Sequence, residues 1–393
     1  MPEKIRLEYS LEKVKQAVGK WLHLDNTEII DVILATHIAN RFNADPIWML
    51  IIAPPSSTKT ELLRGFKDHP DFYSLSTLTP STLISGGKTK DGKNPSLLFK
   101  LNDKTLILKD FTTILSMRSE NQQEILSQLR EIYDGYFSKA FGTGAELAWE
   151  GHVGLIGACT PVYDSHYGVI GSMGDRFMLY RSSQNNNREM GLRAQKIVGR
   201  EDEMRAEIKT AMHSFVDQFE TAEKGFNKNT DEINEMIVAL ACFCAIARCP
   251  VERDRNTRHV KYQPEPEGSG RLTKQLTQIG MALAWVRGKN NIDESVYKTI
   301  KKIGQDLITK QRFEIIKLLW TERCGESFGG WKATKEVARG VKMPATTTKY
   351  ILEDLMVVGA LNQDRENDAE KAPYIWQLSQ EACELIGCSE FFD

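Results

Sequence analysis

The sequence predicts an α/β protein with a parallel sheet covered by helices, then a helical region and a small C-terminal unit. Two observations predict the sheet. Three apolar runs, at 47–53, 104–110 and 151–161, are typical of strands buried on both faces. Helical patterns alternate with these runs, as parallel strands require. A third observation separates the remainder, because from residue 185 to residue 308 the apolar spacing is helical almost throughout.

Length and composition limit the class of protein. A chain of 393 residues predicts two or three domains, and 41% hydrophobic with 26% charged residues is a globular composition. No apolar run reaches the roughly 20 residues that span a bilayer, and the charged start lacks a signal-peptide core. Seven cysteines without framework spacing suit a reducing compartment, so we expect a cytoplasmic protein without membrane contact. The net charge of −2 leaves nucleic-acid binding to local basic patches.

We expect four regions along the chain. Residues 1–45 contain two amphipathic helical stretches, and 46–184 form the α/β core. In this core, 119–135 is a helix, 136–151 a hairpin turning at Gly142–Gly144, and "RFMLYR" a further strand. Residues 185–308 form the helical region, which is broken once by the charged loop "RDRNTRHVKYQPEPEGSG", and 309–393 form the C-terminal unit.

The stretch "IIAPPSSTKTELL" has the strand–loop–helix context of a phosphate-binding loop. In the pattern GxxxxGK[ST], backbone N–H groups and the lysine hold phosphates, and the hydroxyl meets Mg²⁺. Here Ala53 and Thr58 replace the two glycines, and we expect Thr58 to strain the loop by about 1–3 kcal/mol. The alternative is a Ser/Thr-rich turn that caps a helix beside an exposed lysine. The candidate nucleotide-binding residues are Ala53, Pro54, Pro55, Ser56, Ser57, Thr58, Lys59 and Thr60.

A phosphate-binding loop needs an acidic residue at the end of a neighbouring strand, and Asp110 ends the run "TLILKD". Asp110 and Thr60 are therefore the candidate Mg²⁺ ligands. If Asp110 is the magnesium-side acid, Phe111 occupies the position of a general base and hydrolysis is slow. If the register slips by one, Asp110 is the base and Lys109 replaces the metal-side acid. A strand-end aspartate that only caps a turn is the third interpretation.

Two further polar residues follow the later strands. Thr160 ends the run "GLIGACT", where its hydroxyl can orient a water beside a γ-phosphate. Arg176 opens the strand in "GDRFMLYR", and an arginine donated to a neighbour's phosphates can raise turnover by roughly 10³–10⁵. Asp110, Thr160 and Arg176 are the candidate catalytic residues. Taken singly, each has an ordinary structural explanation, and their order along the chain is the stronger signal.

That order resembles the AAA+ ATPases, and within them the MCM-like helicases. "GDRFMLYR" resembles their arginine-finger segment, so the resemblance gives Arg176 that role. "GRLTKQLTQIGMALAWV" is similar to their helical lid, in which an arginine reaches the nucleotide, and Arg271 matches it. The resemblance covers about residues 25–308. It implies ATP and Mg²⁺ as cofactors and a homo-oligomer, expected to be a hexameric ring.

The same resemblance gives the hairpin after "NQQEILSQLREIYDG" a DNA-facing position inside the ring. Lys139 and Phe141 are then the residues that grip one strand by charge and stacking. Only about 45 residues precede the loop strand, so we expect no counterpart of the family's separate N-terminal DNA-binding region among them. Compact forms of this kind resemble the self-loading helicases of phages and mobile elements, which work with other replication proteins.

The last region resembles a winged helix, a variant of the helix-turn-helix that puts its second helix in the major groove. "ATKEVARG", "VKMP" and "PATTTKYILEDL" supply helix, turn and second helix, and an acidic wing follows. The alternative is a module that packs on protein. The candidate DNA-binding residues of this region, to which Lys139 of the hairpin is added, are Lys335, Lys342, Thr346, Thr347, Thr348 and Lys349.

The expected function is therefore an ATP hydrolase that works as an oligomeric DNA motor in DNA replication. The alternative is an ATP-gated DNA-binding scaffold, loader or regulator with little or no hydrolysis, which the altered glycines and the single acid at Asp110 favour. DNA-stimulated phosphate release distinguishes the two.

Overall fold

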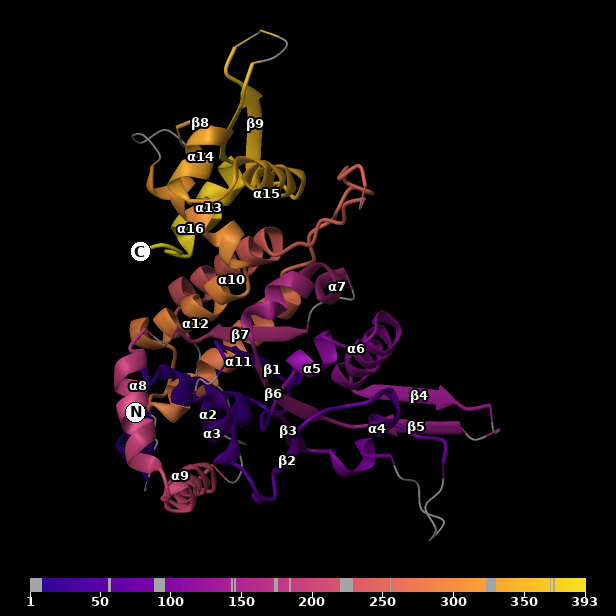
Figure 1. Cartoon of the computed structure of the whole chain (residues 1–393), viewed down its shortest axis with the longest axis vertical. Coiled ribbons are helices and arrows are strands. Elements are labelled where there is room, and N and C mark those ends of the chain that lie inside the picture. The colour runs from indigo at the N-terminus through magenta and orange to yellow at the C-terminus, as the bar shows by residue number, and fades with distance from the viewer. Residues whose placement is uncertain are drawn as a thin grey trace. The chain divides into compact units, whose positions relative to one another are not determined.

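The computed structural model describes residues 9–55, 58–87, 96–142, 144, 146–172, 176–183, 185–219, 229–254, 256–322, 330–367, 369 and 372–393. The chain forms two compact units. The first contains residues 1–166, 173–228 and 278–296, and the second contains 167–172, 229–277 and 297–393. Figure 1 labels their helices and strands.

The first unit is a five-stranded parallel sheet flanked by helices, which confirms the predicted α/β class. The strands lie in the order β2-β3-β6-β1-β7. They span Trp48–Ile52 (β1), Phe72–Leu75 (β2), Lys104–Leu108 (β3), Val153–Cys159 (β6) and Phe177–Arg181 (β7). The helices and 3-10 turns are α1 Leu11–Trp21, α2 Glu28–Ala39, α3 Lys59–Arg64, α4 Pro80–Leu83, η1 Leu98–Lys100, α5 Thr112–Leu115, α6 Ser119–Tyr133, η2 Pro161–His166, α8 Asn187–Ile197 and α9 Glu201–Val216.

The central strands form where the sequence has its continuous apolar runs. Every residue of β1 and β6 is buried, as expected for strands covered on both faces. Trp48 fixes this core, because its indole N–H donates to the carbonyl of Val153 at 2.7 Å and its ring meets Tyr133 edge-on at 5.3 Å. Gly157 allows the close packing, since a Cβ there would lie 2.7 Å from the Leu50 side chain.

Two elements of this unit differ from the prediction. Helix α2 is not amphipathic: all its residues from Ile29 to Ala39 are buried, so its polar members Asp31 and His37 lie inside. The strand β2 was not predicted. It is an edge strand in which only Phe72 is buried, so it lacks the continuous apolar run by which β1, β3 and β6 were found.

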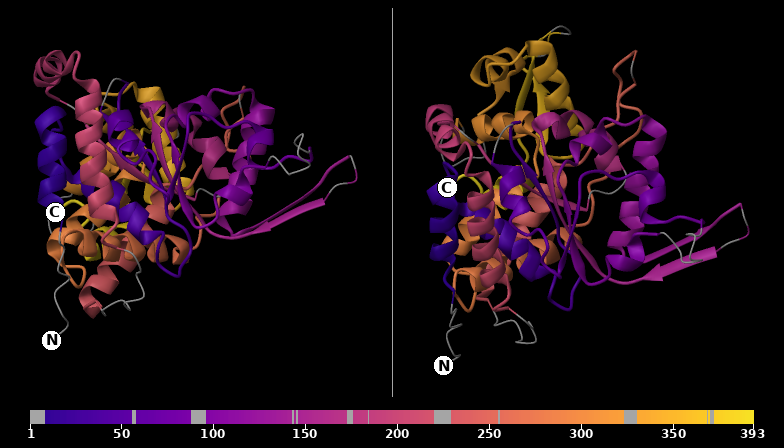
Figure 2. Two further views of the ribbon diagram at one scale, coloured as in Figure 1. Left: turned by 90° about the horizontal axis from the view of Figure 1, so that it is seen from below. Right: turned by 60° about the horizontal axis from the view of Figure 1, so that its bottom comes forward.

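The predicted hairpin is confirmed as β4 (Tyr136–Ala140) and β5 (Glu146–Glu150), which pair antiparallel. Gly144, at the predicted turn, has a φ of +79°, which favours glycine. In both views of Figure 2 the two strands extend away from the five-stranded sheet. The hairpin is anchored at its base, where Phe137 and Trp149 form a buried pair.

The second unit is a set of helices with a small antiparallel sheet. It contains α7 Tyr167–Ser172, α10 Asp231–Ala247, α13 Lys310–Thr321, α14 Thr334–Gly340, α15 Ala345–Val357 and α16 Gln380–Cys388. Helices α11 (Gly270–Val286) and α12 (Glu294–Asp306) each contribute residues to both units. The sheet has the order β8-β10-β9, formed by Lys332–Ala333 (β8), Leu361–Arg365 (β9) and Tyr374–Leu378 (β10).

The C-terminal elements thus follow one another as helix, strand, helix, helix, strand, strand and helix. The two helices and the two antiparallel strands predicted here are present. The short strand β8 and the final helix α16 were not predicted. Two residues are too few for a periodicity to show, and the signal of α16 follows directly on that of β10.

Candidate nucleotide-binding site

The strand order brings three predicted segments to one edge of the sheet. β6 lies between β1 and β3, with Ile52 opposite Cys159 and Leu108 opposite Gly157. All three strands are parallel, so the loop after β1, Thr160 after β6 and Asp110 after β3 leave from the same, carboxyl edge. Ligands of open parallel sheets bind at this edge.

The loop that starts at Ala53 is held at both ends. Ala53 is 1% exposed, and its amide donates to the carbonyl of Cys159 at 3.1 Å. Lys59 begins α3 and is 7% exposed. Its ammonium donates to the carbonyls of Ala53 and Pro54, the latter at 2.9 Å. The lysine therefore closes the loop on itself and is not the exposed side chain of the alternative interpretation. Pro54 and Pro55 are exposed and Thr60 is half-buried, while Ser56 and Ser57 lie outside the described residues.

The expected strain at Thr58 is absent. Thr58 has φ −68° and ψ −3°, which is ordinary right-handed helical backbone that any residue can adopt. Its carbonyl accepts the amide of Leu62 at 3.0 Å, so Thr58 already belongs to the first turn of α3. A β-branched residue costs little in this conformation, and the prediction of 1–3 kcal/mol of strain is wrong.

The pKa of the Lys59 ammonium is affected by its burial and by two nearby side chains. Burial lowers the pKa of Lys59 to about 8, and the nearby Cys159 and Asp110 act in the opposite direction. Burial also raises the pKa of the Cys159 thiol to about 11, which keeps that thiol neutral. Asp110 is thus the acidic partner of the loop lysine across the width of β6.

Thr112 joins Asp110 to Thr160, and sequence reasoning missed it. Its backbone N–H donates to Asp110 Oδ1 at 2.9 Å. Its hydroxyl accepts the N–H of Thr160 at 3.1 Å and donates to the Thr160 hydroxyl at 3.4 Å. Asp110 is exposed and Thr160 half-buried, so both can still meet a ligand. A hydroxyl two residues after a strand-end aspartate was the only available signal.

Phe111 does not stand in the position of a general base. Its side chain is fully buried, and its ring meets Phe177 of β7 edge-on at 5.1 Å. Its amide donates to the carbonyl of Ala158 at 2.7 Å, which fixes the backbone there. Lys109, on the other side of Asp110, is half-buried, and its amide donates to the carbonyl of Leu75. Asp110 is the one carboxylate that this strand end presents.

Arg176 lies at the opposite edge of the sheet from the loop. It precedes the first residue of β7, and the strand is parallel to β1. Five residues at about 3.3 Å each put it roughly 16 Å from the carboxyl edge. Its guanidinium bonds Asp134 at 3.1 Å and lies 5.7 Å from the ring of Tyr133. Arg176 therefore does not join Lys59, Asp110 and Thr160 of its own chain.

A different arginine lies at the carboxyl edge. Arg181 ends β7 directly opposite Ile52, the residue before the loop. Its guanidinium makes a bidentate pair with Asp164 of η2, at 2.6 and 3.0 Å. Because η2 starts right after Thr160, this pair fixes the segment that carries Thr160. Sequence reasoning missed Arg181, since an arginine at a strand end has no motif of its own.

Arg271 belongs to the second unit, near the start of α11. Its guanidinium pairs with Glu267, and the buried Arg248 pairs with the same carboxylate.

In the hairpin, the Lys139 ammonium pairs with Glu124 at 3.0 Å and lies 5.7 Å from the Phe141 ring. That ring packs on Gly86, where a Cβ would lie 2.5 Å from it, so this side of the ring is covered and only the remainder could meet a base.

Five of the six predicted DNA-binding residues of the C-terminal unit lie at the start of α15 or in the turn before it, and the sixth, Lys335, lies in α14. Lys335, Lys342, Thr346 and Lys349 are exposed, and Thr347 is half-buried. The prediction does not hold for Thr348, which is fully buried with its hydroxyl donating to the carbonyl of Pro344 at 3.1 Å. The helix turns this third threonine into the core, so it is excluded from any contact surface.

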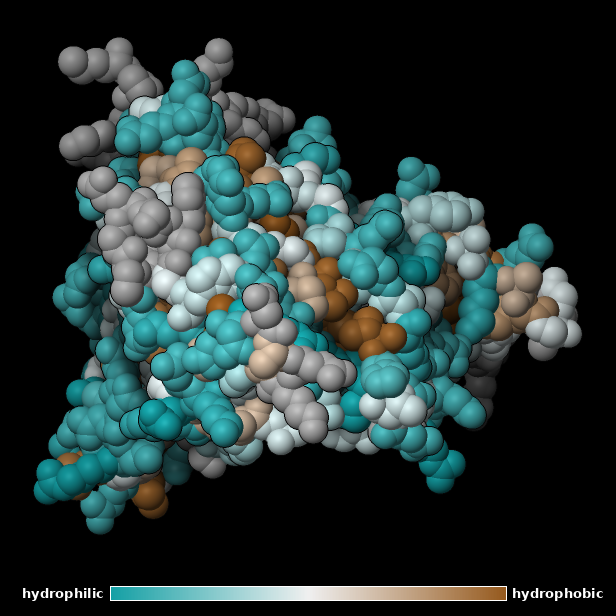
Figure 3. All heavy atoms as spheres, turned by 90° about the horizontal axis from the view of Figure 1, so that it is seen from above, coloured by the Kyte–Doolittle hydropathy of each residue, from teal (hydrophilic) through white to brown (hydrophobic). Residues whose placement is uncertain are grey.

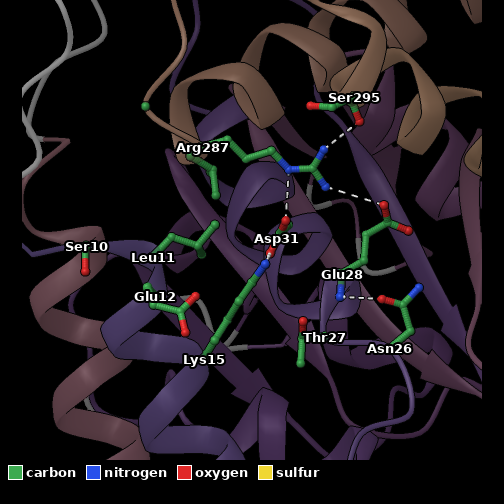
Figure 4. A pocket seen from close by; sticks show the side chains of 12 residues that line it. Ser10, Leu11, Glu12, Lys15, Asn26, Thr27, Glu28, Asp31, Arg287 and Ser295 are labelled. Carbon is green, nitrogen blue, oxygen red and sulfur yellow. Dashed lines mark hydrogen bonds and ion pairs between the residues drawn. The ribbon is translucent and has the colours of Figure 1, made fainter.

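The first unit also has a cavity of about 680 Å³ between α1, α2 and the end of α11. Figure 4 shows Lys15 and Arg287 pointing at the buried carboxylate of Asp31, with ion-pair distances of 2.6 and 2.9 Å. Arg287 also reaches Glu28 at 3.4 Å. The charged side chains of this cavity pair with one another, and none of the predicted site residues lines the cavity.

Comparisons with known proteins add no family to this description. No protein-family model matches the chain, and no curated protein matches it.

Within the described residues, no helix is both long and apolar enough to cross a membrane. On the face drawn in Figure 3, hydrophilic side chains predominate and apolar ones form small patches near its centre.

Proposed function

We propose that this chain binds ATP and Mg²⁺ at the carboxyl edge of its sheet and is an oligomeric, ATP-driven DNA motor of the MCM-like AAA+ kind. One observation carries the proposal. β6 separates β1 from β3, so the Lys59 loop and Asp110 lie on either side of Thr160. A triphosphate held by the loop would then have its γ-phosphate beside a carboxylate and a hydroxyl, as hydrolysis requires.

The residues of the loop fit a triphosphate. Within the described part of the chain, the Lys59 ammonium donates to two neutral carbonyls and forms no direct salt bridge with a carboxylate, so phosphate oxygens can replace those carbonyls at low cost. Phosphate binding would restore a full anionic partner to a buried cation whose pKa is lowered to about 8 by burial. Lys59 would neutralise phosphate charge, which is its role in hydrolysis.

The residues beside the loop also fit Mg²⁺, which prefers hard oxygen ligands and keeps several waters. Thr60 offers a hydroxyl and Asp110 an exposed carboxylate. When bound, Mg²⁺ would neutralise charge on the phosphates. Thr112 holds Asp110 and Thr160 in fixed relation, so that Thr160 can orient the attacking water. None of these roles requires the sheet to move.

The oligomer in this proposal follows from Arg176. At about 16 Å from the carboxyl edge it cannot serve its own chain's nucleotide. An arginine supplied to the site of a second copy would stabilise transition-state charge. The Arg176 side chain is 15% exposed and that of its partner Asp134 is 50% exposed, so the guanidinium would have to leave a partly buried ion pair to reach the phosphates of the second copy. A closed ring, expected to be hexameric, would repeat this contact, and Arg271 of the lid helix would report the bound nucleotide.

DNA is the proposed substrate of the motor. The hairpin β4–β5, with Lys139, would face one strand in the ring. The order helix, strand, helix, helix, strand, strand in residues 309–393 supports a winged helix that would bind duplex DNA through α15. Lys342, Thr346 and Lys349 lie exposed at its start. Other replication proteins would be the further partners.

The burial of Phe111 favours a second candidate function. With that side chain in the core, Asp110 has no acidic neighbour to act as general base. An ATP-gated scaffold or loader needs binding and assembly but no turnover. It would use the same loop, with Lys59 as the sensor of phosphate.

Phosphate release from ATP, with and without single-stranded and forked DNA, separates the two. We expect DNA-stimulated release in the wild type and its loss in both Lys59→Ala and Asp110→Asn. The control is Lys100→Ala, an exposed lysine of η1 in the same unit, which should leave release unchanged. ATP binding without release, again lost in Lys59→Ala, would replace the motor with the scaffold. Absence of binding would overturn both.

A further inference from the structure

The charged loop between α10 and α11 packs against the second helix of the C-terminal unit, in the same compact unit. We call the described residues 251–254 and 256–263 the basic loop, which follows α10 in Figure 1. The side chain of Arg253 is only 9% exposed. Its guanidinium donates to Asp354 at 2.8 Å, to Glu353 at 3.2 Å and to the carbonyl of Tyr350 at 3.1 Å. One largely buried arginine thus fixes the loop to three acceptors of α15, which lie within little more than one helical turn.

Two further contacts extend this attachment along the helix. The Tyr350 ring lies 4.9 Å from the guanidinium of Arg253 and 5.3 Å from that of Arg258, both within cation–π distance. The side-chain amide of Gln263 donates from Nε2 to the carbonyl of Val357 at 3.0 Å. The basic loop therefore follows one flank of α15 from Tyr350 to Val357. It leaves the first turns, with Thr346 and Lys349, exposed.

The outer side of the basic loop carries basic side chains. Arg258, His259 and Lys261 are exposed. The loop's own carboxylates are already engaged: Glu252 pairs with Lys261, and Asp254 accepts the backbone N–H groups of residues 256 and 257 at 2.9 and 2.8 Å. An exposed pair such as Glu252 with Lys261 contributes little and can exchange for another anion.

The position of the loop on α15 decides which anion it meets. A helix with its side chains is about 10–12 Å across, and the major groove is about 12 Å wide, so an inserted helix fills the groove. Anything packed on the helix flank then lies at the groove wall, which is the phosphate backbone. We propose that the basic loop is a phosphate-contacting arm of the DNA interface, with Arg258 and Lys261 as its contacts. This rests on the proposed function, specifically on duplex DNA bound by α15.

Contacts of this kind have a distinct signature. Phosphate contacts carry no sequence information, and each contributes about 0.9 to the slope of log affinity against log salt. Removing two should lower the magnitude of that slope by about 2. At 0.1 M salt the same loss corresponds to a weakening of up to about 60-fold.

The test is duplex binding by fluorescence anisotropy across a salt series, with the full chain. Arg258→Gln/Lys261→Gln should weaken all duplexes alike and lower the slope, and both residues are exposed, so folding is spared. Lys310→Gln/Lys317→Gln removes the same charge from the exposed side of α13 and should change neither. Thr346→Ala should lower affinity only for a preferred sequence and keep the slope.

Three outcomes decide the matter. Weaker binding with a reduced slope, absent in the α13 variant, supports the arm. Unchanged or tighter binding by the loop variant, with a wild type that binds duplex DNA, overturns it while the proposed DNA function stands. A wild type that does not bind duplex DNA overturns the arm together with the DNA part of the proposed function.

Discussion

The sequence suggests that a second acidic residue could be placed beside Asp110, but the structure predicts that this substitution would fail. Read as a motif, Phe111→Glu installs the missing general base and should speed hydrolysis. In the structure the Phe111 side chain is fully buried against Phe177, so a glutamate there would face the core. We expect Phe111→Glu to unfold the first unit or leave it barely folded, with no gain in phosphate release.

The magnitude follows from burial. Truncating a buried phenylalanine costs about 3–5 kcal/mol, and burying a carboxyl group without partners adds several more. The sum approaches the whole stability of a typical domain, about 5–15 kcal/mol. Phe111→Leu, which keeps an apolar group there, should cost roughly 1–1.5 kcal/mol. Lys109→Glu changes a half-buried strand-end residue and should stay within about 1 kcal/mol.

Urea denaturation followed by circular dichroism measures these costs, and phosphate release measures any gained turnover. The expected order of stability is wild type and Lys109→Glu, then Phe111→Leu, then Phe111→Glu. A Phe111→Glu protein that unfolds at the wild-type urea concentration and hydrolyses ATP faster would refute the reasoning. It would mean that this side chain faces the nucleotide.

Three further predictions concern other residues of the first unit. Thr58→Gly should lower stability by about 0.5–1 kcal/mol in urea denaturation, since Thr58 is unstrained and glycine adds entropy only to the unfolded chain; a gain would restore the strain hypothesis. Asp164→Asn should cost about 1–2 kcal/mol by leaving the Arg181 guanidinium without its carboxylate, and a double-mutant cycle with Arg181→Gln should show coupling between them. Burial lowers the pKa of His37 well below 6.5, so the unfolded chain binds more protons in acid: stability should be complete above pH 6.5 and fall below it, by up to about 1.4 kcal/mol for the first pH unit. His37→Gln should flatten the dependence measured in urea between pH 7.5 and 5.5, and an unchanged slope would assign it to other groups.

The sequence by itself determined the strands that form the centre of the sheet. β1, β3 and β6 are continuous apolar runs because both their faces are covered, and such runs are visible without any partner. The hairpin and the helices of the second unit were likewise local signals. The edge strand β2 was missed because only Phe72 is buried and its other residues, which are half-buried, make its composition mixed.

Only the tertiary structure decided which polar residues share a site. The order β3-β6-β1 makes neighbours of Asp110, Thr160 and the Lys59 loop, although about 50 residues separate each from the next along the chain. It also removes Arg176 from that edge and puts Arg181 there, because two residues of one strand lie at opposite edges of a parallel sheet. The sequence also could not show the direction in which a side chain points. Phe111 and Thr348 each follow a polar or charged residue in the chain, but the end of the strand and the turn of the helix direct their side chains into the core. In the core, packing sets the role of a side chain, and its position in a motif does not.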